Sequence, residues 1–305
     1  MKSDPVRIKI VIYGIALLSC GWLSWKTLQG EQSPLTMQHV SAAIKPESFS
    51  FLETSPDVLI DRIIILSGLQ NQIEEIGGKI LQEIKQSKDK PDNPDVAMEM
   101  EKIVIESFGP EHFHRRLRVA LKTGSDIERL ANLAHSFNSP QMRKITEIEG
   151  REFDLMAFES FVENVTRNPL PTNRIRLLQM LESVTYTTHF AIELTASLKR
   201  AMRMGTVNDD NAAMNALDAE LNTQKKKMAD NIYQAMILTM AYVYRELDDL
   251  ELEAYVQFYQ TEEGEWFIKQ AVNALTEAFR AGALQTGKRI SELINAKKTH
   301  TKPSS

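Results

Sequence analysis

The chain has 305 residues, of which 43% are hydrophobic and 25% are charged, a balance that is ordinary for a globular protein with a buried core. Its formal charge of -5 and the absence of a Lys/Arg cluster on any single helical face argue against nucleic-acid binding, which depends on neutralising phosphates. The single cysteine, Cys20, excludes an intramolecular disulfide and a zinc site built from cysteines.

Residues 1–26 have the features of a targeting or anchoring segment, because basic residues precede an uncharged apolar run at residues 10–25. Three interpretations are open: an uncleaved signal anchor that crosses a bacterial inner membrane once, a lipoprotein signal with a lipidated Cys20, and the cleaved signal of a secreted protein. The anchor is favoured, because no small-x-small cleavage site follows the run and because Trp22 and Trp25 suit a membrane interface. The basic residues predict a cytoplasmic N-terminus and a periplasmic location for the rest of the chain.

A polar tether at residues 27–56, broken by prolines, follows this segment. Beyond it, apolar residues recur every three or four positions, which predicts amphipathic helices that pack on one another. Ser125 and Glu128 have the spacing of a capping box, and Ser139 with Pro140 is expected to begin another helix. The helices are expected at about residues 57–86, 96–108, 111–122, 126–137, 140–165, 174–204, 210–245, 248–260 and 262–296.

The proline-containing stretch at residues 167–173 is the clearest internal boundary. It separates two helical regions, residues 57–166 and residues 174–296, and a polar tail occupies residues 297–305. The predicted fold class is therefore all-α: a helical bundle of two tandem similar units behind an N-terminal membrane or signal-anchor helix.

The similarity of the two units rests on apolar stripes that recur at a fixed distance. Two offsets appear, 122 for the later helices and 115 for the leading helices, and seven inserted residues account for the difference. Ser139 falls on Thr261, so each stripe is followed by a helix cap. Chance agreement is the alternative, because such spacings recur in any helical bundle. The pairs at 122 are Leu130 with Leu252, Leu133 with Tyr255, Ala134 with Val256 and Phe137 with Tyr259; those at 115 are Leu66 with Leu181, Leu69 with Val184, Ile73 with Thr188 and Ile76 with Ala191.

A short motif stands out in the second unit, within residues 248–269. It consists of Glu251, Leu252, Phe258, Tyr259, Thr261 and Gly264. This motif resembles the E-L…F-Y-x-S/T-x-x-G pattern of the bacterial family called domain of unknown function 2059, over about residues 210–280. The usual proline after the Ser/Thr is Glu262 here, and the first unit has Met142 where the motif has glycine. The resemblance implies an all-helical, exported bacterial protein and transfers no catalytic residues.

The motif also has a physical explanation that needs no ligand. Leu252, Tyr255 and Tyr259 lie on one helical stripe, Thr261 is expected to cap the next helix, and Gly264 permits a close approach of the two helices. On this interpretation Phe258→Ala costs about 3–5 kcal/mol if Phe258 is fully buried.

The sequence contains no motif for catalysis, metal binding or cofactor binding, so no cofactor is expected. Glu111, His112 and His114 form the richest histidine cluster, but side chains two positions apart on a helix point about 200° apart and share a metal poorly. His189 is expected to be a core or boundary residue. The side chains of adjacent acidic residues on a helix, such as Asp248 and Asp249, point about 100° apart, so they are not expected to form an acid/base pair.

These observations favour a non-catalytic interaction module of the bacterial envelope, which contacts another envelope protein or itself. The alternative is an exported hydrolase or ligand-binding protein with a site between the two units. A pocket between the units, lined by converging polar groups, would favour the alternative; a solid core with an exposed apolar groove would favour the module.

Overall fold

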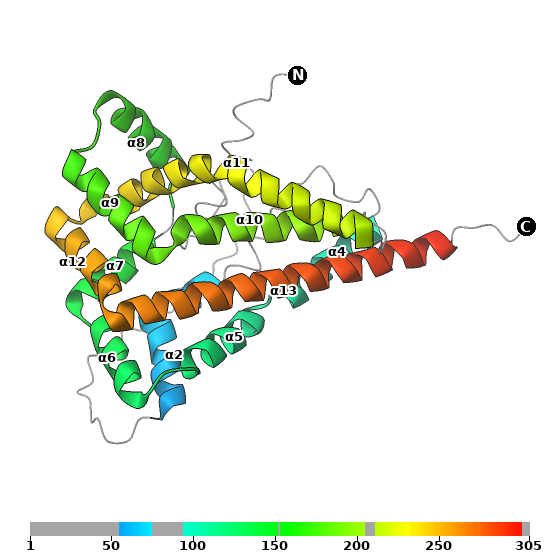
Figure 1. Ribbon diagram of the computed structural model, residues 1–305, viewed down its shortest axis with the longest axis horizontal. Coiled ribbons are helices and arrows are strands. Elements are labelled where there is room, and N and C mark those ends of the chain that lie inside the picture. Colours follow the sequence, from blue (N-terminus) through cyan, green and yellow to red (C-terminus); the bar gives the residue numbers. More distant parts are fainter. Residues whose placement is uncertain (1–54, 75–93, 152, 205–210, 301–305) are drawn as a thin grey trace, which may run out of the picture.

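The computed structural model describes residues 55–74, 94–151, 153–204 and 211–300 (Figure 1). Within these residues the chain forms eleven α-helices, one 3-10 helix and no strand, which confirms the all-α prediction. No helix in this part of the chain is both long enough and apolar enough to cross a bilayer. The predicted anchor, including Cys20, and nearly all of the tether lie outside the described residues.

Several helices begin at the caps that their sequences supply. Ser55, Ser139 and Asp154 each accept a hydrogen bond from a backbone N–H in the first turn of the helix that follows. The elements are α2 (Pro56–Leu66), α4 (Pro94–Ser107), α5 (Pro110–Lys122), α6 (Ile127–Phe137), α7 (Pro140–Glu149), α8 (Leu155–Arg167), α9 (Thr172–Thr185), α10 (Thr187–Met204), α11 (Asn211–Val243), η1 (Tyr244–Glu246), α12 (Asp249–Gln260) and α13 (Glu262–His300).

Three of the predicted helices are interrupted. The first turns at Ser67 and Gly68, whose φ of 76° ends a helix readily. The second stops at Glu149, and Asp154 caps a separate helix, α8. The third breaks at Tyr186, whose φ of 55° lies in the left-handed region and separates α9 from α10.

The capping residue of α6 also differs from the prediction. Asp126, and not Ser125, accepts a hydrogen bond from the backbone N–H of Arg129 at 2.8 Å. The Ser125 hydroxyl instead donates to the carbonyl oxygen of Leu121 at 2.7 Å, at the end of the preceding helix. The predicted capping box at Ser125 and Glu128 was therefore wrong, because the residue that caps α6 is Asp126, one position later.

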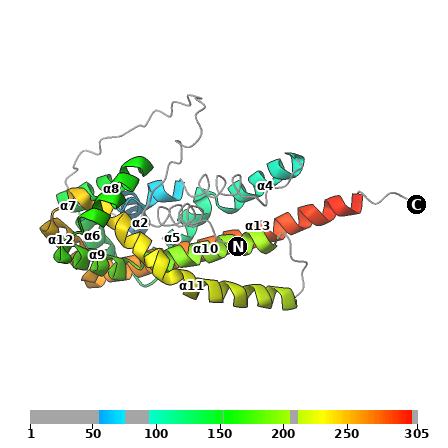
Figure 2. The same ribbon diagram turned by 90° about the horizontal axis from the view of Figure 1, so that it is seen from above.

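The long helices α10, α11 and α13 lie together, and α13 extends past α10, α5 and α4 (Figure 1). Seen from above, α6, α7, α8, α9 and α12 gather at one end of the molecule, and α4, α10, α11 and α13 extend toward the other (Figure 2). Helix α2 packs on α6 in the N-terminal half (α2 to α7), and α9 packs on α12 in the C-terminal half (α9 to α13).

One continuous hydrophobic core joins the two halves. Phe137 of α6 links them directly, because its ring lies 4.8 Å from the ring of Phe267 on α13 and 5.1 Å from the ring of Phe258 on α12. The halves therefore stabilise each other, and any site between them has a packed frame.

Candidate functional site

The residues of the motif form the corner between α12 and α13. Leu252, Tyr255 and Tyr259 are buried on one stripe of α12. Glu251 completes a capping box with Asp248, in which each side chain accepts from the other's backbone N–H, and it also pairs with Lys144 of α7. The motif therefore fixes how α12 begins and how it faces the core.

The turn of this corner depends on its cap and on its glycine. The backbone N–H of Gly264 donates to the Thr261 hydroxyl at 3.1 Å. A Cβ atom added at Gly264 would lie 2.1 Å from the carbonyl oxygen of Phe258, far inside contact distance. Phe258 itself is only partly buried. The condition of full burial, under which Phe258→Ala would cost about 3–5 kcal/mol, is therefore not met.

Beside this corner, two tyrosine hydroxyls meet on one carboxylate. Tyr244 of η1 donates to Oε1 of Glu149 at 2.6 Å, and Tyr255 of α12 donates to the same oxygen at 2.9 Å. The hydroxyl of Tyr259 lies 3.4 Å from that of Tyr255. Glu149 is the last residue of α7, so the carboxylate comes from the N-terminal half and its donors come from the C-terminal half.

Glu149 and the three tyrosines open on a pocket of about 110 Å³, hereafter the Glu149 pocket. Glu149 is the one charged side chain among the described residues that line it. The other polar lining residues are Ser67, Gln72, Thr185 and Thr187; the apolar ones are Leu69, Phe190, Met240, Phe267, Ile268, Ala271, Val272 and Leu275. The pocket thus has one acidic group, the Glu149 carboxyl, in a wall that is otherwise aromatic, aliphatic or neutral and polar.

Burial raises the pKa of the Glu149 carboxyl, and the hydrogen bonds from Tyr244 and Tyr255 offset part of that rise. Burial, followed by the nearby Glu149 carboxylate, raises the pKa of Tyr255 and of Tyr259. Both tyrosines consequently remain protonated at neutral pH and can serve as hydrogen-bond donors.

The junction between α9 and α10 forms another wall of the pocket. Thr185 and Thr187 line it, their hydroxyl oxygens are 2.6 Å apart, and Tyr186 lies between them in the left-handed conformation. The carboxylate of Glu182 accepts from the backbone N–H of Thr188 at 3.1 Å and so caps α10. A left-handed tyrosine costs about 1–2 kcal/mol, and the surrounding contacts hold it in place.

Arg174 holds the backbone of Tyr244 in place through a hydrogen bond to its carbonyl oxygen. This buried guanidinium donates to the carbonyl oxygen of Tyr244 at 2.5 Å and to Asp249 at 3.1 Å. Asn173 donates to the same carboxylate at 2.7 Å. The start of α9 is thereby tied to both η1 and α12, which supply the tyrosines.

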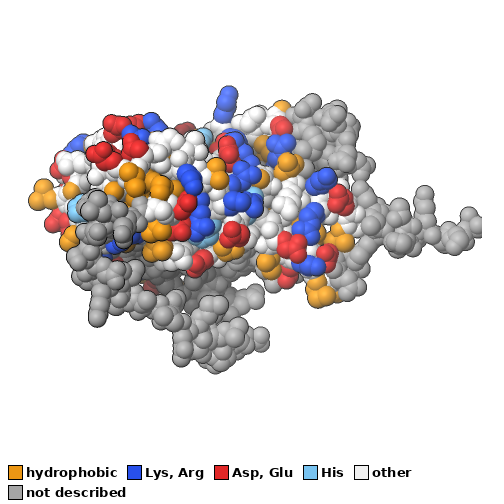
Figure 3. Space-filling view, turned by 90° about the horizontal axis from the view of Figure 1, so that it is seen from below, with side chains coloured by type: hydrophobic (Ala, Val, Ile, Leu, Met, Phe, Trp, Pro, Cys, Tyr) orange, Lys and Arg blue, Asp and Glu red, His pale blue; other side chains and the backbone are white. Residues whose placement is uncertain are grey.

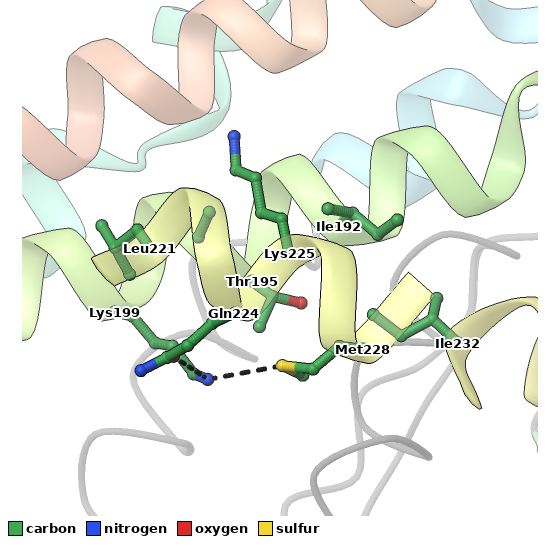
Figure 4. Close-up of a pocket in the computed structure, with 9 residues that line it drawn as sticks. Ile192, Thr195, Lys199, Leu221, Gln224, Lys225, Met228 and Ile232 are labelled. Carbon is green, nitrogen blue, oxygen red and sulfur yellow. Dashed lines mark hydrogen bonds between the residues drawn. The ribbon is translucent and has the colours of Figure 1, made fainter. Parts of the chain in front are cut away.

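Two other pockets lie along α10 and α11. The smaller holds about 10 Å³, room for about one water molecule, and its Lys199 amine donates to Gln224 at 3.0 Å and lies 3.6 Å from the sulfur of Met228 (Figure 4). The larger is a groove of about 460 Å³, where Lys225 and Arg280 both pair with the carboxylate of Glu193. In each pocket the charged groups named here already have partners within the protein.

The histidines do not assemble a site. His112 lies within 3.0 Å of the carbonyl oxygen of Ala278, so it packs against α13 and does not sit at a solvated helix start. Burial lowers its pKa. His189 is exposed, contrary to the expected core or boundary position. In the part of the chain that the structure describes, no group of three or more His, Cys, Asp or Glu residues could hold a metal ion.

No family model, curated protein or solved structure matches the chain. The sequence singled out Tyr255 and Tyr259 as members of a packing stripe, but it did not single out Glu149 or Tyr244. The signal that could have identified Glu149 is the glycine that follows it, because Gly150 ends α7 and places the carboxylate at a helix end.

Proposed function

We propose that the chain is a non-enzymatic protein that binds a small ligand in the Glu149 pocket. The observation that carries this proposal is a carboxylate between the halves whose two tyrosine donors both reach Oε1. Among the described residues no hydrogen bond reaches Oε2, which leaves that oxygen for a ligand. Glu149 is only partly buried and its Oε2 is not among the buried side-chain atoms that lack a partner, so this oxygen is accessible from the pocket.

Binding accounts for the pocket better than catalysis does. Acid/base or nucleophilic chemistry needs a second reactive group, and no other carboxylate, histidine, lysine, arginine or cysteine of the described residues lines the pocket. Tyr255 and Tyr259 have raised pKa values, so their hydroxyls stay protonated and are poor bases at neutral pH. One carboxylate in an apolar setting favours recognition of a ligand over turnover.

We propose further that the two halves are copies of one design. The starts of α6 and α12 are 122 residues apart, as are the starts of α7 and α13. Their contacts are reciprocal at the same offset: Arg129 lies over the ring of Trp266, and the equivalent residue Glu251 pairs with Lys144, the equivalent of Trp266. Reciprocal contacts of this kind are characteristic of two-fold related units and support the proposal, in which the Glu149 pocket would lie at the joint between the copies.

We also propose that residues 1–26 anchor the protein in a bacterial inner membrane and that the helical part faces the periplasm. This location rests on the basic, then apolar, N-terminal sequence. The pocket would then sample small molecules of the periplasm.

A second candidate is the interaction module, which contacts another envelope protein or a second copy. The groove between α10, α11 and α13 favours it, because Leu284 beside the groove is 52% exposed. On the face seen from below, Lys and Arg side chains alternate with Asp and Glu, and apolar side chains lie among them (Figure 3). Cross-linking of the full chain in membranes tests this candidate, which fails if neither a partner nor a dimer is recovered.

The binding proposal is tested by ligand-observed NMR on the full chain in dodecyl maltoside, with small cationic, neutral and anionic compounds. At least one class is expected to show saturation transfer from the wild-type protein. Val272→Phe, which fills the edge of the pocket from a partly buried position, should abolish that signal, whereas Leu250→Phe, at an exposed position, should not. No binding by any class, or binding that persists in Val272→Phe, would refute the proposal.

A further inference from the structure

We infer that the ligand of the Glu149 pocket carries an organic ammonium group, which sits between the Glu149 carboxylate and the tyrosine rings. This inference rests on the proposed binding function and assigns its ligand class. Its arguments are the charge of the pocket, the chemistry of its walls and the arrangement of its rings.

The charge of the pocket favours a cation. In its ionised form, which a bound cation would favour, Glu149 contributes a negative charge, and the described lining residues contribute no positive charge to balance it. Tyr244 and Tyr255 donate hydrogen bonds to Glu149, and the hydroxyl of Tyr259 lies 3.4 Å from that of Tyr255. A cation that reached Oε2 would form the charge-assisted contact that the protein itself does not supply.

The walls favour an organic cation over a hydrated metal ion. Calcium and magnesium require six or more oxygen ligands, and the two nearest tyrosine hydroxyls already donate their protons to Oε1. Met240, Ile268 and Val272 offer apolar contacts that suit carbon-bearing substituents and not a shell of water.

The rings beside Glu149 form a packed aromatic cluster at the pocket wall. Tyr244 and Tyr255 have centroids 6.0 Å apart at 66°, and Tyr255 and Tyr259 have centroids 5.1 Å apart at 60°. Both pairs pack edge to face, and Phe190 and Phe267 add aromatic surface to the same pocket. An aromatic wall of this kind can attract an ammonium group with methyl substituents through cation–π interaction.

The test uses calorimetric titration of the full chain in dodecyl maltoside, a detergent that carries no ammonium group. The probes are choline, its uncharged carbon isostere 3,3-dimethylbutan-1-ol, ethanolamine and acetate. Choline is expected to bind at least roughly tenfold more tightly than its isostere, because the charge adds attraction to both the carboxylate and the rings. Stronger binding of ethanolamine than of choline would assign a primary ammonium ligand, which also supports the inference.

Three variants separate the contributions. Glu149→Gln should weaken choline binding by roughly tenfold or more and leave the isostere within about twofold. Tyr259→Leu removes a ring and should also weaken choline, after circular dichroism has shown that the variant is folded. Glu251→Gln, a carboxylate of the same corner that lies outside the pocket, should change neither probe.

Three results would overturn the inference. If acetate or the isostere binds as tightly as choline and Val272→Phe abolishes that binding, the pocket is a ligand site but the ammonium assignment is wrong. If choline binds and Glu149→Gln leaves its affinity unchanged, the assignment is also wrong. If no probe binds and the wider compound set also fails, the proposed function falls together with the inference.

Discussion

The two helix corners, α6–α7 and α12–α13, share the same construction but differ in side chains, and three of the positions that differ are informative. Each corner begins with an aspartate cap, carries a buried stripe and ends with a hydroxyl cap at Ser139 or Thr261. Where the first corner has Leu133, Phe137 and Met142, the second has Tyr255, Tyr259 and Gly264. A joint of this shape can thus be packed without tyrosine or glycine, so the second corner has features that packing alone does not require.

The added features point to different physical roles. Gly264 permits the close approach of α13 to the end of α12, because a Cβ atom at this position would lie 2.1 Å from the Phe258 carbonyl oxygen. Tyr255 supplies a hydroxyl to Glu149, and Tyr259 places a second hydroxyl beside it. The comparison indicates that the second corner is specialised for the Glu149 pocket, and variants that make it more like the first corner test this.

The largest effect is expected for Gly264→Ala. Its Cβ meets backbone, which cannot move aside as a flexible side chain could, so the variant should lose about 3 kcal/mol in the free energy of unfolding, measured by urea denaturation. Gly124→Ala is the control, because its φ of 73° is strained but no atom lies within 4 Å of the added Cβ. The control should lose about 1 kcal/mol. Equal losses would show that the corner is not tightly closed.

A smaller loss is expected for Phe258→Ala. The ring is partly buried against Phe137 and Tyr259, with centroids 5.1 Å and 5.0 Å away, so truncation should cost about 2 kcal/mol. Leu250→Ala, at a position that is 76% exposed on the same helix, should stay within about 0.5 kcal/mol of the wild type in the same urea titration. A loss at Phe258 no greater than that at Leu250 would remove Phe258 from the contact between the corners.

Next in size is the difference between Tyr255→Phe and Tyr259→Phe. Tyr255→Phe removes a 2.9 Å hydrogen bond to a carboxylate and should cost about 1.5 kcal/mol. Tyr259→Phe restores the residue of the first corner and loses only a 3.4 Å contact to another hydroxyl, so its cost should stay below about 0.5 kcal/mol. Thermal unfolding of the two variants makes the comparison. If Tyr259→Phe is the more damaging, the proposed roles of the hydroxyls are reversed.

The smallest expected effect is a dependence of the free energy of unfolding on pH, whose sign shows whether the pKa of Glu149 is raised in the folded state. Because the pKa of Glu149 is raised in the folded state, the unfolded chain releases this proton first, and the carboxyl destabilises the fold as pH rises from the ordinary glutamate range to its raised pKa. Relative to Glu149→Gln, the wild type should therefore lose stability over that interval.

Glu251→Gln supplies the opposite slope. The hydrogen bond from Lys144, followed by that from the Asp248 backbone, lowers the pKa of Glu251. The stabilisation that Glu251 contributes is present above its unfolded pKa and is lost as pH falls through the lowered value. Relative to its Gln variant, the wild type should lose stability with rising pH above the ordinary glutamate range at Glu149 and gain stability with rising pH below that range at Glu251, as measured by urea titration. Slopes of the same sign would contradict the assignment of Glu149 as a desolvated carboxyl.

Much of the helix pattern could be predicted from the sequence, because caps and apolar periodicity act locally. Ser139 begins α7 and Thr261 caps α13, as expected, and the stripe at Leu252, Tyr255 and Tyr259 is buried. Where a break depends on distant contacts, prediction failed. The left-handed conformation of Tyr186 has no local signal, since glycine and asparagine are the usual residues there.

The candidate site was harder to predict than the helices. Its residues come from segments as far apart as Ser67 and Leu275, and Glu149 lay in the middle of a helix that was expected to continue. A carboxylate at that place would be an ordinary surface residue. Only the end of α7 and the packing of the second corner bring it to two tyrosines.

The most direct test of the account is the titration of the Glu149 side-chain carboxyl by carbon NMR, with and without saturating choline. In the free protein its pKa should lie above the ordinary glutamate range, because burial disfavours the charged form. Bound choline should lower that pKa, because a nearby cation favours the carboxylate. An ordinary pKa that choline does not move would contradict the account.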